Sequence, residues 1–224
     1  MQCQGTPSIS SRSTPALGAT GEATLHEVFA ETAVDGAATG FALGHIPQTD
    51  KPLLWIQDRI TRKEAGRPSL AGLPASLQII HVDVSKPIDV LWAMEEGLCC
   101  TSLCGVLGEV WGDPPMLDFT ATKRLALRAE THGVPAWLMR RAAHPNLSAA
   151  RERWRLSSLP SLGHPYDARA PGQAQWQAEL FRARWRTPGE WVVHHDPALG
   201  LQFAHKVSED HSAAPDQHPA TGHG

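Results

Sequence analysis

Residues 104–141, CGVLGEVWGDPPMLDFTATKRLALRAETHGVPAWLMRR, decide the fold class of this chain. They comprise an apolar run (104–110), a turn rich in Gly and Pro, an amphipathic run (118–132) that Gly133 ends, and a second apolar run (135–139). Two short apolar runs around a helix-length periodic segment are typical of a strand–helix–strand unit with parallel strands. The middle of the chain is therefore predicted to be α/β.

The alternation of strand and helix continues on the N-terminal side of this unit. Short apolar runs predict strands at residues 25–30, 53–57 and 77–82. Segments of helical length predict helices at residues 36–46 and 87–98, and the charged segment 58–69 is predicted to be a loop. Repeated alternation with short connections favours a doubly wound, mostly parallel sheet with helices on both faces.

The pattern changes after Arg141. One more strand is predicted at residues 153–159, followed by a polar loop rich in Pro and Gly at residues 160–172. Residues 176–185 and 190–195 then alternate apolar with polar side chains, and residues 201–204 extend this pattern. Period-two alternation around tight turns predicts a C-terminal antiparallel meander. The predicted fold class is thus α/β, with a mostly parallel sheet that ends in this meander.

The two ends of the chain differ from its middle. Residues 1–21 and 208–224 are rich in Ser, Thr, Gly, Pro and His and carry few large apolar side chains, so we expect a disordered leader and a disordered tail. Residues 22–207 are expected to form one domain. No apolar run approaches the roughly 20 residues that cross a bilayer, and the N-terminus lacks the apolar segment of a signal peptide. These features predict a cytoplasmic protein without a membrane partner.

The cysteines give no recognisable metal motif. Cys99, Cys100 and Cys104 fall within six residues, but no second cluster lies at the spacing of a zinc site, and Cys3 stands alone. They are interpreted as small apolar residues at the end of a helix and the start of a strand. We expect neither a metal site nor a cofactor.

The connection after the first predicted strand is where this fold class binds phosphate. A phosphate-binding loop has the pattern GxxxxGK[ST], in which the glycines admit the backbone, the lysine neutralises the phosphates and the hydroxyl binds magnesium. When the second glycine is placed on Gly36, Glu31 stands at the first glycine, Ala37 at the lysine and Ala38 at the hydroxyl. The loop is therefore predicted to be degenerate.

Glu109 lies where such a fold carries its magnesium-binding acid. It ends an apolar strand, and Asp113 follows in the next turn. An acid at this place is also common as a helix cap or a loop charge. ATP hydrolysis by a degenerate loop, with Glu109 as the acid, stays an alternative, although the missing lysine and hydroxyl argue against it.

No arrangement of Ser, His or Cys suggests a nucleophile, and Ser148 is predicted to be a helix N-cap.

Charge is distributed unevenly along the chain, whose net charge is −3. Between residues 139 and 186 there are nine arginines, no lysine and three acids. Arginines interleaved with aromatic residues suit single-stranded nucleic acid or an acidic partner; alternatively, the tryptophans cover the sheet and the arginines form its solvated face. The candidate contact residues are Arg140, Arg141, Arg151, Arg153, Trp154, Arg155, Arg182 and Arg184.

Four ordered blocks carry a resemblance to a known family. They are residues 25–43 (LHEVFAETAVDGAATGFAL), 53–68 (LLWIQDRITRKEAGRP), 108–161 (GEVWGDPPMLDFTATKRLALRAETHGVPAWLMRRAAHPNLSAARERWRLSSLPS) and 176–193 (WQAELFRARWRTPGEWVV). Together they resemble the ImuA family, as found in alphaproteobacteria, over roughly residues 22–196.

The resemblance implies a RecA-like fold, which has also been proposed for the cell-division inhibitor SulA. It implies an accessory factor of SOS-induced translesion mutagenesis, without catalysis of its own, whose partners are ImuB and an error-prone C-family DNA polymerase. RecA and single-stranded DNA are further partners that it suggests, and residues 142–152 fall where RecA has a mobile DNA-contacting loop. A degenerate RecA-like ATPase and a SulA-like inhibitor of cell division remain the alternatives.

Overall fold

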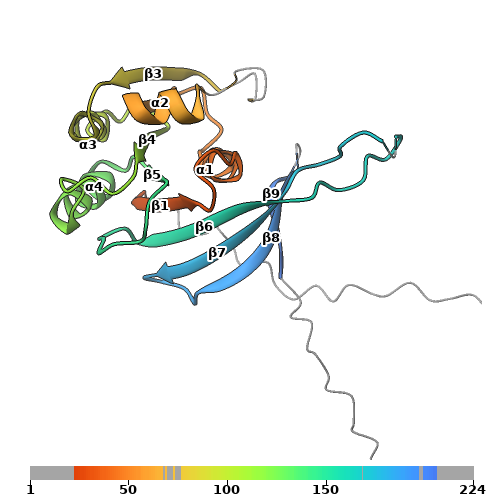
Figure 1. Cartoon of the computed structure of the whole chain (residues 1–224). Coiled ribbons are helices and arrows are strands. Elements are labelled where there is room, and N and C mark those ends of the chain that lie inside the picture. The colour runs from red at the N-terminus through yellow and green to blue at the C-terminus, as the bar shows by residue number, and fades with distance from the viewer. Residues whose placement is uncertain are drawn as a thin grey trace, which may run out of the picture.

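Nine strands of the described chain form one sheet (Figure 1). The computed structural model describes residues 23–67, 69, 73, 77–167, 169–196 and 199–205. The strands are β1 (Leu25–Ala30), β2 (Leu53–Asp58), β3 (Ile79–Val84), β4 (Gly105–Trp111), β5 (Ala136–Arg141), β6 (Glu152–Leu159), β7 (Gln175–Ala183), β8 (Gly189–Asp196) and β9 (Gly200–His205). Their order is β3-β2-β4-β5-β1-β6-β7-β8-β9. The first six strands in this order run parallel, and β7, β8 and β9 add an antiparallel meander, as predicted.

Four helices of the described chain connect the parallel strands. They are α1 (Ala37–His45), α2 (Arg59–Ala65), α3 (Pro87–Gly97) and α4 (Phe119–His132). Local chemistry sets the ends of α4, because the Asp118 carboxylate accepts a hydrogen bond from the Ala121 amide at 2.8 Å and Gly133 adopts a left-handed φ of 68°. Such a carboxylate cap and glycine stop are typical helix boundaries. The strand–helix–strand unit of residues 104–141 is therefore confirmed as β4–α4–β5.

The helices divide between the two faces of the sheet. On one face, α3 and α4 bury apolar side chains that include Val90, Leu91, Leu125 and Ala126. On the other face, α1 packs Phe41 against Trp137 and Trp154 of the sheet, with ring centroids 6.1 and 4.9 Å apart. Both faces of the inner parallel strands β1, β2, β4 and β5 are thus covered, which explains why these strands are mostly apolar and buried along nearly their whole length.

The meander, which continues the sheet beyond β6, also packs against α1. The positions of a side chain on Gly40 and Gly44 are taken by the Trp176 ring and the Leu201 side chain, respectively. A Cβ on Gly40 would lie 2.5 Å from Trp176 Cζ2, so only glycine lets strand β7 approach the helix this closely. The small residues of α1 therefore allow the meander to close around it.

Three local expectations are corrected. The charged segment after β2 is the helix α2, because the Asp58 carboxylate accepts a hydrogen bond from the Thr61 amide at 2.6 Å and caps it. Strand β3 begins two residues later than predicted. Ser148 starts no helix; its hydroxyl accepts a hydrogen bond from the Ala150 amide in an irregular connection.

The predicted leader and tail lie outside the described residues. Within the described ranges, no helix combines the length and apolar character needed to span a membrane.

The close approach of β7 to α1 predicts that Gly40→Ala destabilises the protein. Alanine is the better helix former by about 1 kcal/mol, but overpacking against a rigid ring costs about 1–3 kcal/mol. We expect a net loss of roughly 1 kcal/mol in the free energy of unfolding, measured by urea denaturation. The control is Gly36→Ala, because a Cβ there meets nothing within 4 Å. Equal stability of the two variants would contradict the packing described.

Candidate functional site

The connection from β1 to α1 is filled by a carboxylate of the chain itself. Asp35 Oδ1 accepts hydrogen bonds from the Ala37 amide at 2.8 Å and from the Ser158 hydroxyl at 2.6 Å, and Oδ2 accepts one from the Ser158 amide at 2.8 Å. Burial opposes ionisation of Asp35, but these hydrogen bonds outweigh it and lower its pKa. A helix N-terminus following the first strand is the usual place for a bound anion. Here an ionised side chain occupies it.

A buried arginine closes the same connection from the side of the sheet. Arg141, at the end of β5, donates from Nη1 to the carbonyl oxygens of Ala33 and Asp35 at 3.0 and 3.3 Å. Its Nη2 donates to Thr39 Oγ1 at 2.8 Å, and its Nε donates to Glu109 Oε2 at 2.7 Å. The guanidinium therefore ties the β1–α1 connection to the acid at the end of β4.

Both carboxylate oxygens of Glu109 are used within the protein. Besides the bond from Arg141 to Oε2, Oε1 accepts hydrogen bonds from Trp55 Nε1 at 2.6 Å and from Gln57 Nε2 at 3.2 Å. Glu109 is 1% exposed, and the Gln57 amide oxygen is in turn 2.8 Å from His81 Nε2. Glu109 is thus neutralised and shielded, an environment that differs from that of an acid available to magnesium or water.

The predicted degenerate phosphate loop lies at this place. Glu31 is exposed, and Gly36 is the residue before the first turn of α1. Ala37 and Ala38, which stand where a phosphate loop has its lysine and hydroxyl, are buried in the core under α1. Asp35 is thus bonded within the protein and Ala37 and Ala38 are buried, whereas the side chains of Glu31, Thr32 and Val34 are exposed.

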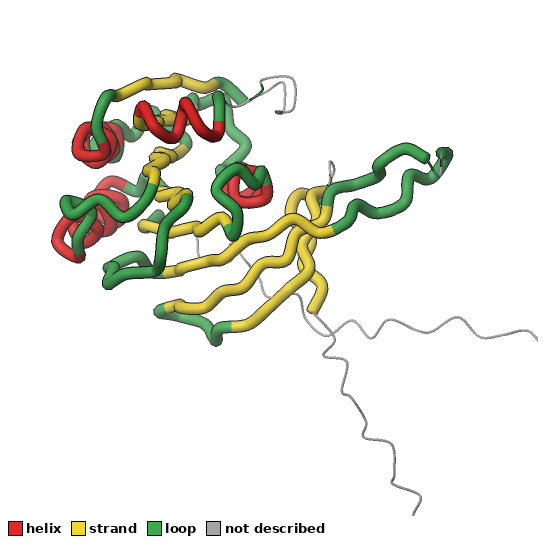
Figure 2. Tube along the Cα trace, in the orientation of Figure 1, coloured by secondary structure: helices red, strands yellow, loops and turns green. Residues whose placement is uncertain are grey.

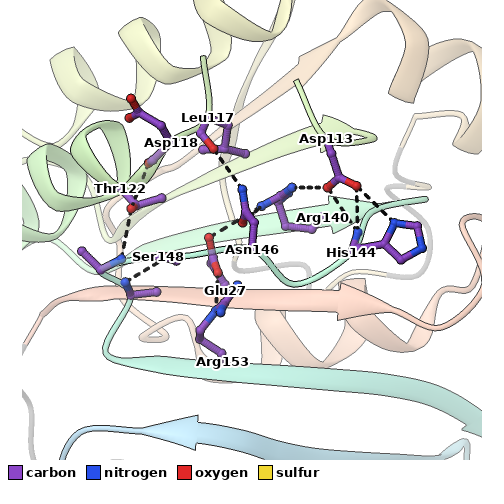
Figure 3. Close-up of polar contacts among 12 residues, drawn as sticks. Glu27, Asp113, Leu117, Asp118, Thr122, Arg140, His144, Asn146, Ser148 and Arg153 are labelled. Atoms are coloured by element: carbon purple, nitrogen blue, oxygen red, sulfur yellow. Dashed lines mark hydrogen bonds and ion pairs between the residues drawn. The ribbon is translucent and has the colours of Figure 1, made fainter. Parts of the chain in front are cut away.

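A second buried acid organises the candidate arginines (Figure 3). Glu27 of β1 is fully buried; Arg153 Nε donates to its Oε2 at 2.6 Å, and Arg140 Nη1 lies 3.9 Å from its Oε1. Arg140 Nη2 also donates to Asp113 Oδ1 at 2.7 Å, and its Nη1 donates to Asn146 Oδ1 at 3.3 Å. The figure shows the two arginines converging on Glu27 from β5 and β6.

This network also holds the connection between β5 and β6 in place. The His144 amide donates to both Asp113 carboxylate oxygens, at 3.2 and 3.1 Å, and Asn146 Nδ2 donates to the Leu117 carbonyl oxygen at 3.2 Å. Ala149 is anchored to Thr122 Oγ1 at 3.0 Å. Burial opposes ionisation of Asp113, but the bonds from His144 outweigh it and lower its pKa. Hydrogen bonds to Asp113, Leu117 and Thr122 thus hold the predicted DNA-contacting loop in place.

The predicted contact surface is wrong for four of its residues. Arg140, Arg141, Arg153 and Trp154 are at most 5% exposed. The arginines are buried because they neutralise Glu27 and Glu109, and Trp154 lies among the rings of the α1 core. These four side chains do not form an exposed surface.

The other four candidates lie nearer the surface. Arg151 forms an ion pair with Glu130, and Arg155 forms one with Glu179. Arg182 and Arg184 are exposed at the end of β7, and the Arg184 guanidinium lies 5.7 Å from the centroid of the Trp185 ring, a residue that is 49% exposed. A bulge between β6 and β7 opposite Arg153 shifts the register here.

Sequence reasoning missed Asp35, Ser158 and Glu27 as parts of these networks. Glu27 had a signal, because an acid inside an otherwise apolar strand requires a cation as partner. The matching signal was Arg140, at the end of the apolar run of β5. Asp35 and Ser158 are 123 positions apart, and no sequence pattern links them.

Comparison with known proteins establishes the fold. No protein-family model and no curated protein matches the chain. The crystal structure of the RadB recombinase matches with a TM-score of 0.52 and 15% identity, covering 80% of this chain and 89% of that chain. The fold is therefore RecA-like, as the resemblance implied, and the comparison reaches no further than the fold.

The burial of Glu109 and Arg141 predicts strong coupling between them. Removing either charge alone, by Glu109→Gln or Arg141→Met, leaves the other buried without its partner and should cost about 3–5 kcal/mol in the free energy of unfolding. The double variant should cost less than the sum of the single variants, by about 1–3 kcal/mol. Urea denaturation of all four proteins measures this coupling.

The exposed pair Arg155 and Glu179 serves as the control, since removal of a surface ion pair costs about 1 kcal/mol or less. Simple additivity of the Glu109 and Arg141 variants would contradict the arrangement described.

Proposed function

We propose that this protein is a non-catalytic RecA-like adaptor of DNA-damage-induced mutagenesis, which acts with ImuB and an error-prone C-family DNA polymerase. The observation that carries the proposal is the occupied nucleotide position. Asp35 takes the anion position at α1, while Arg141 and Glu109 neutralise each other beside it. A RecA-like scaffold with this arrangement acts by binding partners through its surfaces and not by hydrolysing ATP.

Three features of the site support the absence of hydrolysis. A phosphate needs unoccupied backbone amides and a cation, whereas the Ala37 amide donates to Asp35 and the Arg141 guanidinium is bonded to Glu109. A magnesium ion needs a free carboxylate, whereas Glu109 accepts three hydrogen bonds from protein groups. A phosphate placed at α1 would also meet the negative charge of Asp35.

The particular process follows from the family resemblance. The four blocks that resemble the ImuA family fall on the main structural elements: β1 with α1, β2 with α2, β4 through β6, and β7 with β8. The RecA-like fold is the one that the resemblance implies. The four blocks and the fold favour an accessory role in translesion mutagenesis. No feature of the described residues supports the alternative, a SulA-like role.

Within the predicted basic contact, we favour the end of β7 as the part that touches DNA. Arg182 and Arg184 are exposed, and Trp185 has a partly exposed ring beside Arg184. Guanidinium groups next to an aromatic ring suit single-stranded DNA, in which phosphates alternate with stackable bases. We therefore place the DNA contact of the adaptor at these three residues.

A test of the adaptor role uses the protein and its expected partner. Purified chain should bind purified ImuB, and deletion of its gene should lower the frequency of damage-induced mutations to that of a strain without ImuB. Restoring the gene should restore mutagenesis. A chain that neither binds ImuB nor changes the mutation frequency when deleted would rule out the proposed function.

A separate test addresses the DNA contact. Changing both Arg182 and Arg184 to Ala should weaken binding of single-stranded DNA and lower the slope of log affinity against log salt by about 1.4, since each lost phosphate contact removes about 0.7. Fluorescence anisotropy over a salt series measures the slope. Arg62→Ala is the control, because Arg62 is also partly exposed but pairs with Asp83 on α2's side of the molecule. The same slope in the double variant and the wild type would exclude this contact.

A further inference from the structure

The connection between β6 and β7 projects away from the sheet as an arm, here defined as residues 160–167 and 169–174 (Figures 1 and 2). Backbone hydrogen bonds hold its two sides together: the Leu162 amide donates to the Gln173 carbonyl oxygen at 2.9 Å, and the Gly172 amide donates to the Leu162 carbonyl oxygen at 3.0 Å. Gly163 and Pro171 form a bridge between the two sides. The arm is thus a structured extension of the two strands.

The tip of the arm is fixed by its own side chains. His164 Nδ1 accepts hydrogen bonds from the amides of Tyr166 and Asp167 at 3.3 and 3.1 Å. The Asp167 carboxylate accepts one from the Arg169 amide at 2.9 Å, and the Asp167 carbonyl oxygen accepts one from the Ala170 amide at 3.1 Å. A turn ordered before binding loses little conformational entropy when a partner is bound.

The arm presents a large aromatic side chain to solvent. Tyr166 is the single tyrosine of the chain and is 93% exposed; its ring lies edge-on to His164, with centroids 6.1 Å apart. Leu162, nearer the base of the arm, is 40% exposed. Tyrosine is a frequent anchor of protein interfaces, because its ring buries a large area while its hydroxyl finds a polar partner.

The charge of the arm distinguishes between classes of partner. Asp167 and Arg169 are its charged residues, so the arm carries no net charge. Nucleic-acid contacts depend on an excess of positive charge, which the arm lacks. A neutral, proline-containing turn with an exposed tyrosine fits an apolar pocket on a protein.

We propose that this arm is a protein-docking element, in which Tyr166 inserts into an apolar pocket of the protein that the adaptor holds. The inference rests on the proposed function, in which that protein is ImuB. The arm and the basic end of β7 then serve two different partners, since one surface is neutral and aromatic and the other is cationic.

The experiment titrates purified ImuB into the full-length chain by calorimetry. Tyr166→Ala should weaken the affinity at least about tenfold, as loss of an interface anchor does. Leu199→Ala is the matched control, because Leu199 is a 72% exposed apolar side chain in the turn between β8 and β9; it should bind as the wild type does. Equal affinity of Tyr166→Ala and wild type would overturn the inference and leave the proposed function intact.

A second pair of variants tests the fixed turn. His164→Ala removes the acceptor of the two amides and should weaken binding about two- to tenfold. His164→Asn places Oδ1 where Nδ1 was, can accept the same bonds as in an Asx turn, and should restore the affinity. Binding unaffected by His164→Ala, or equally weakened in both variants, would contradict a role for the ordered turn.

Photocrosslinking separates failure of this inference from failure of the proposed function. Absence of ImuB binding by the wild type, together with an unchanged mutation frequency on deletion, would reject the proposed function. Independently, a benzophenone amino acid at position 166 should give, in damaged cells, an adduct that antibodies against ImuB recognise, whereas one at position 199 should not. An adduct with nucleic acid, or no adduct from position 166, would overturn the inference.

Discussion

The ion pair between Glu109 and Arg141 is the interaction on which the arrangement of the site depends. It joins the ends of two neighbouring strands, β4 and β5, and through Arg141 it reaches the carbonyl oxygens of the β1–α1 connection. A charge buried this deeply is tolerated only when a partner and further hydrogen bonds satisfy it. The closed geometry of the β1–α1 connection is therefore a consequence of how the core satisfies one acid.

Glu27 follows the same rule on the face of the sheet that α3 and α4 cover. Its pairing with Arg153 and Arg140 draws both arginines inward, and Arg140 then fixes Asp113 and the connection from β5 to β6. Arg140 and Arg153 thus stabilise the interior of the protein and are not available to a partner. The groups left for partners lie beyond the parallel strands, on the meander and on the arm between β6 and β7.

Periodicity was sufficient to predict the parallel strands, the meander and three of the four described helices, because their apolar patterns follow directly from burial. It failed at α2, whose charged sequence lacks an apolar stripe and whose start depends on the Asp58 cap. The degenerate phosphate loop was visible as missing residues, but its replacement by Asp35 and Ser158 was not, since these meet only in the folded chain. Burial of Arg140 and Arg153 was missed because alternation along a strand identifies a face without showing what covers it.

In the proposed function, side chains of the protein itself occupy the nucleotide position of the RecA-like fold. Thermal unfolding of the purified protein with increasing ATP and magnesium tests it most directly, with an active RecA-like ATPase as the positive control. We expect an unchanged melting temperature at millimolar nucleotide. A rise equivalent to about 2.7 kcal/mol, the stabilisation that a ligand provides at 100 times its dissociation constant, would contradict it.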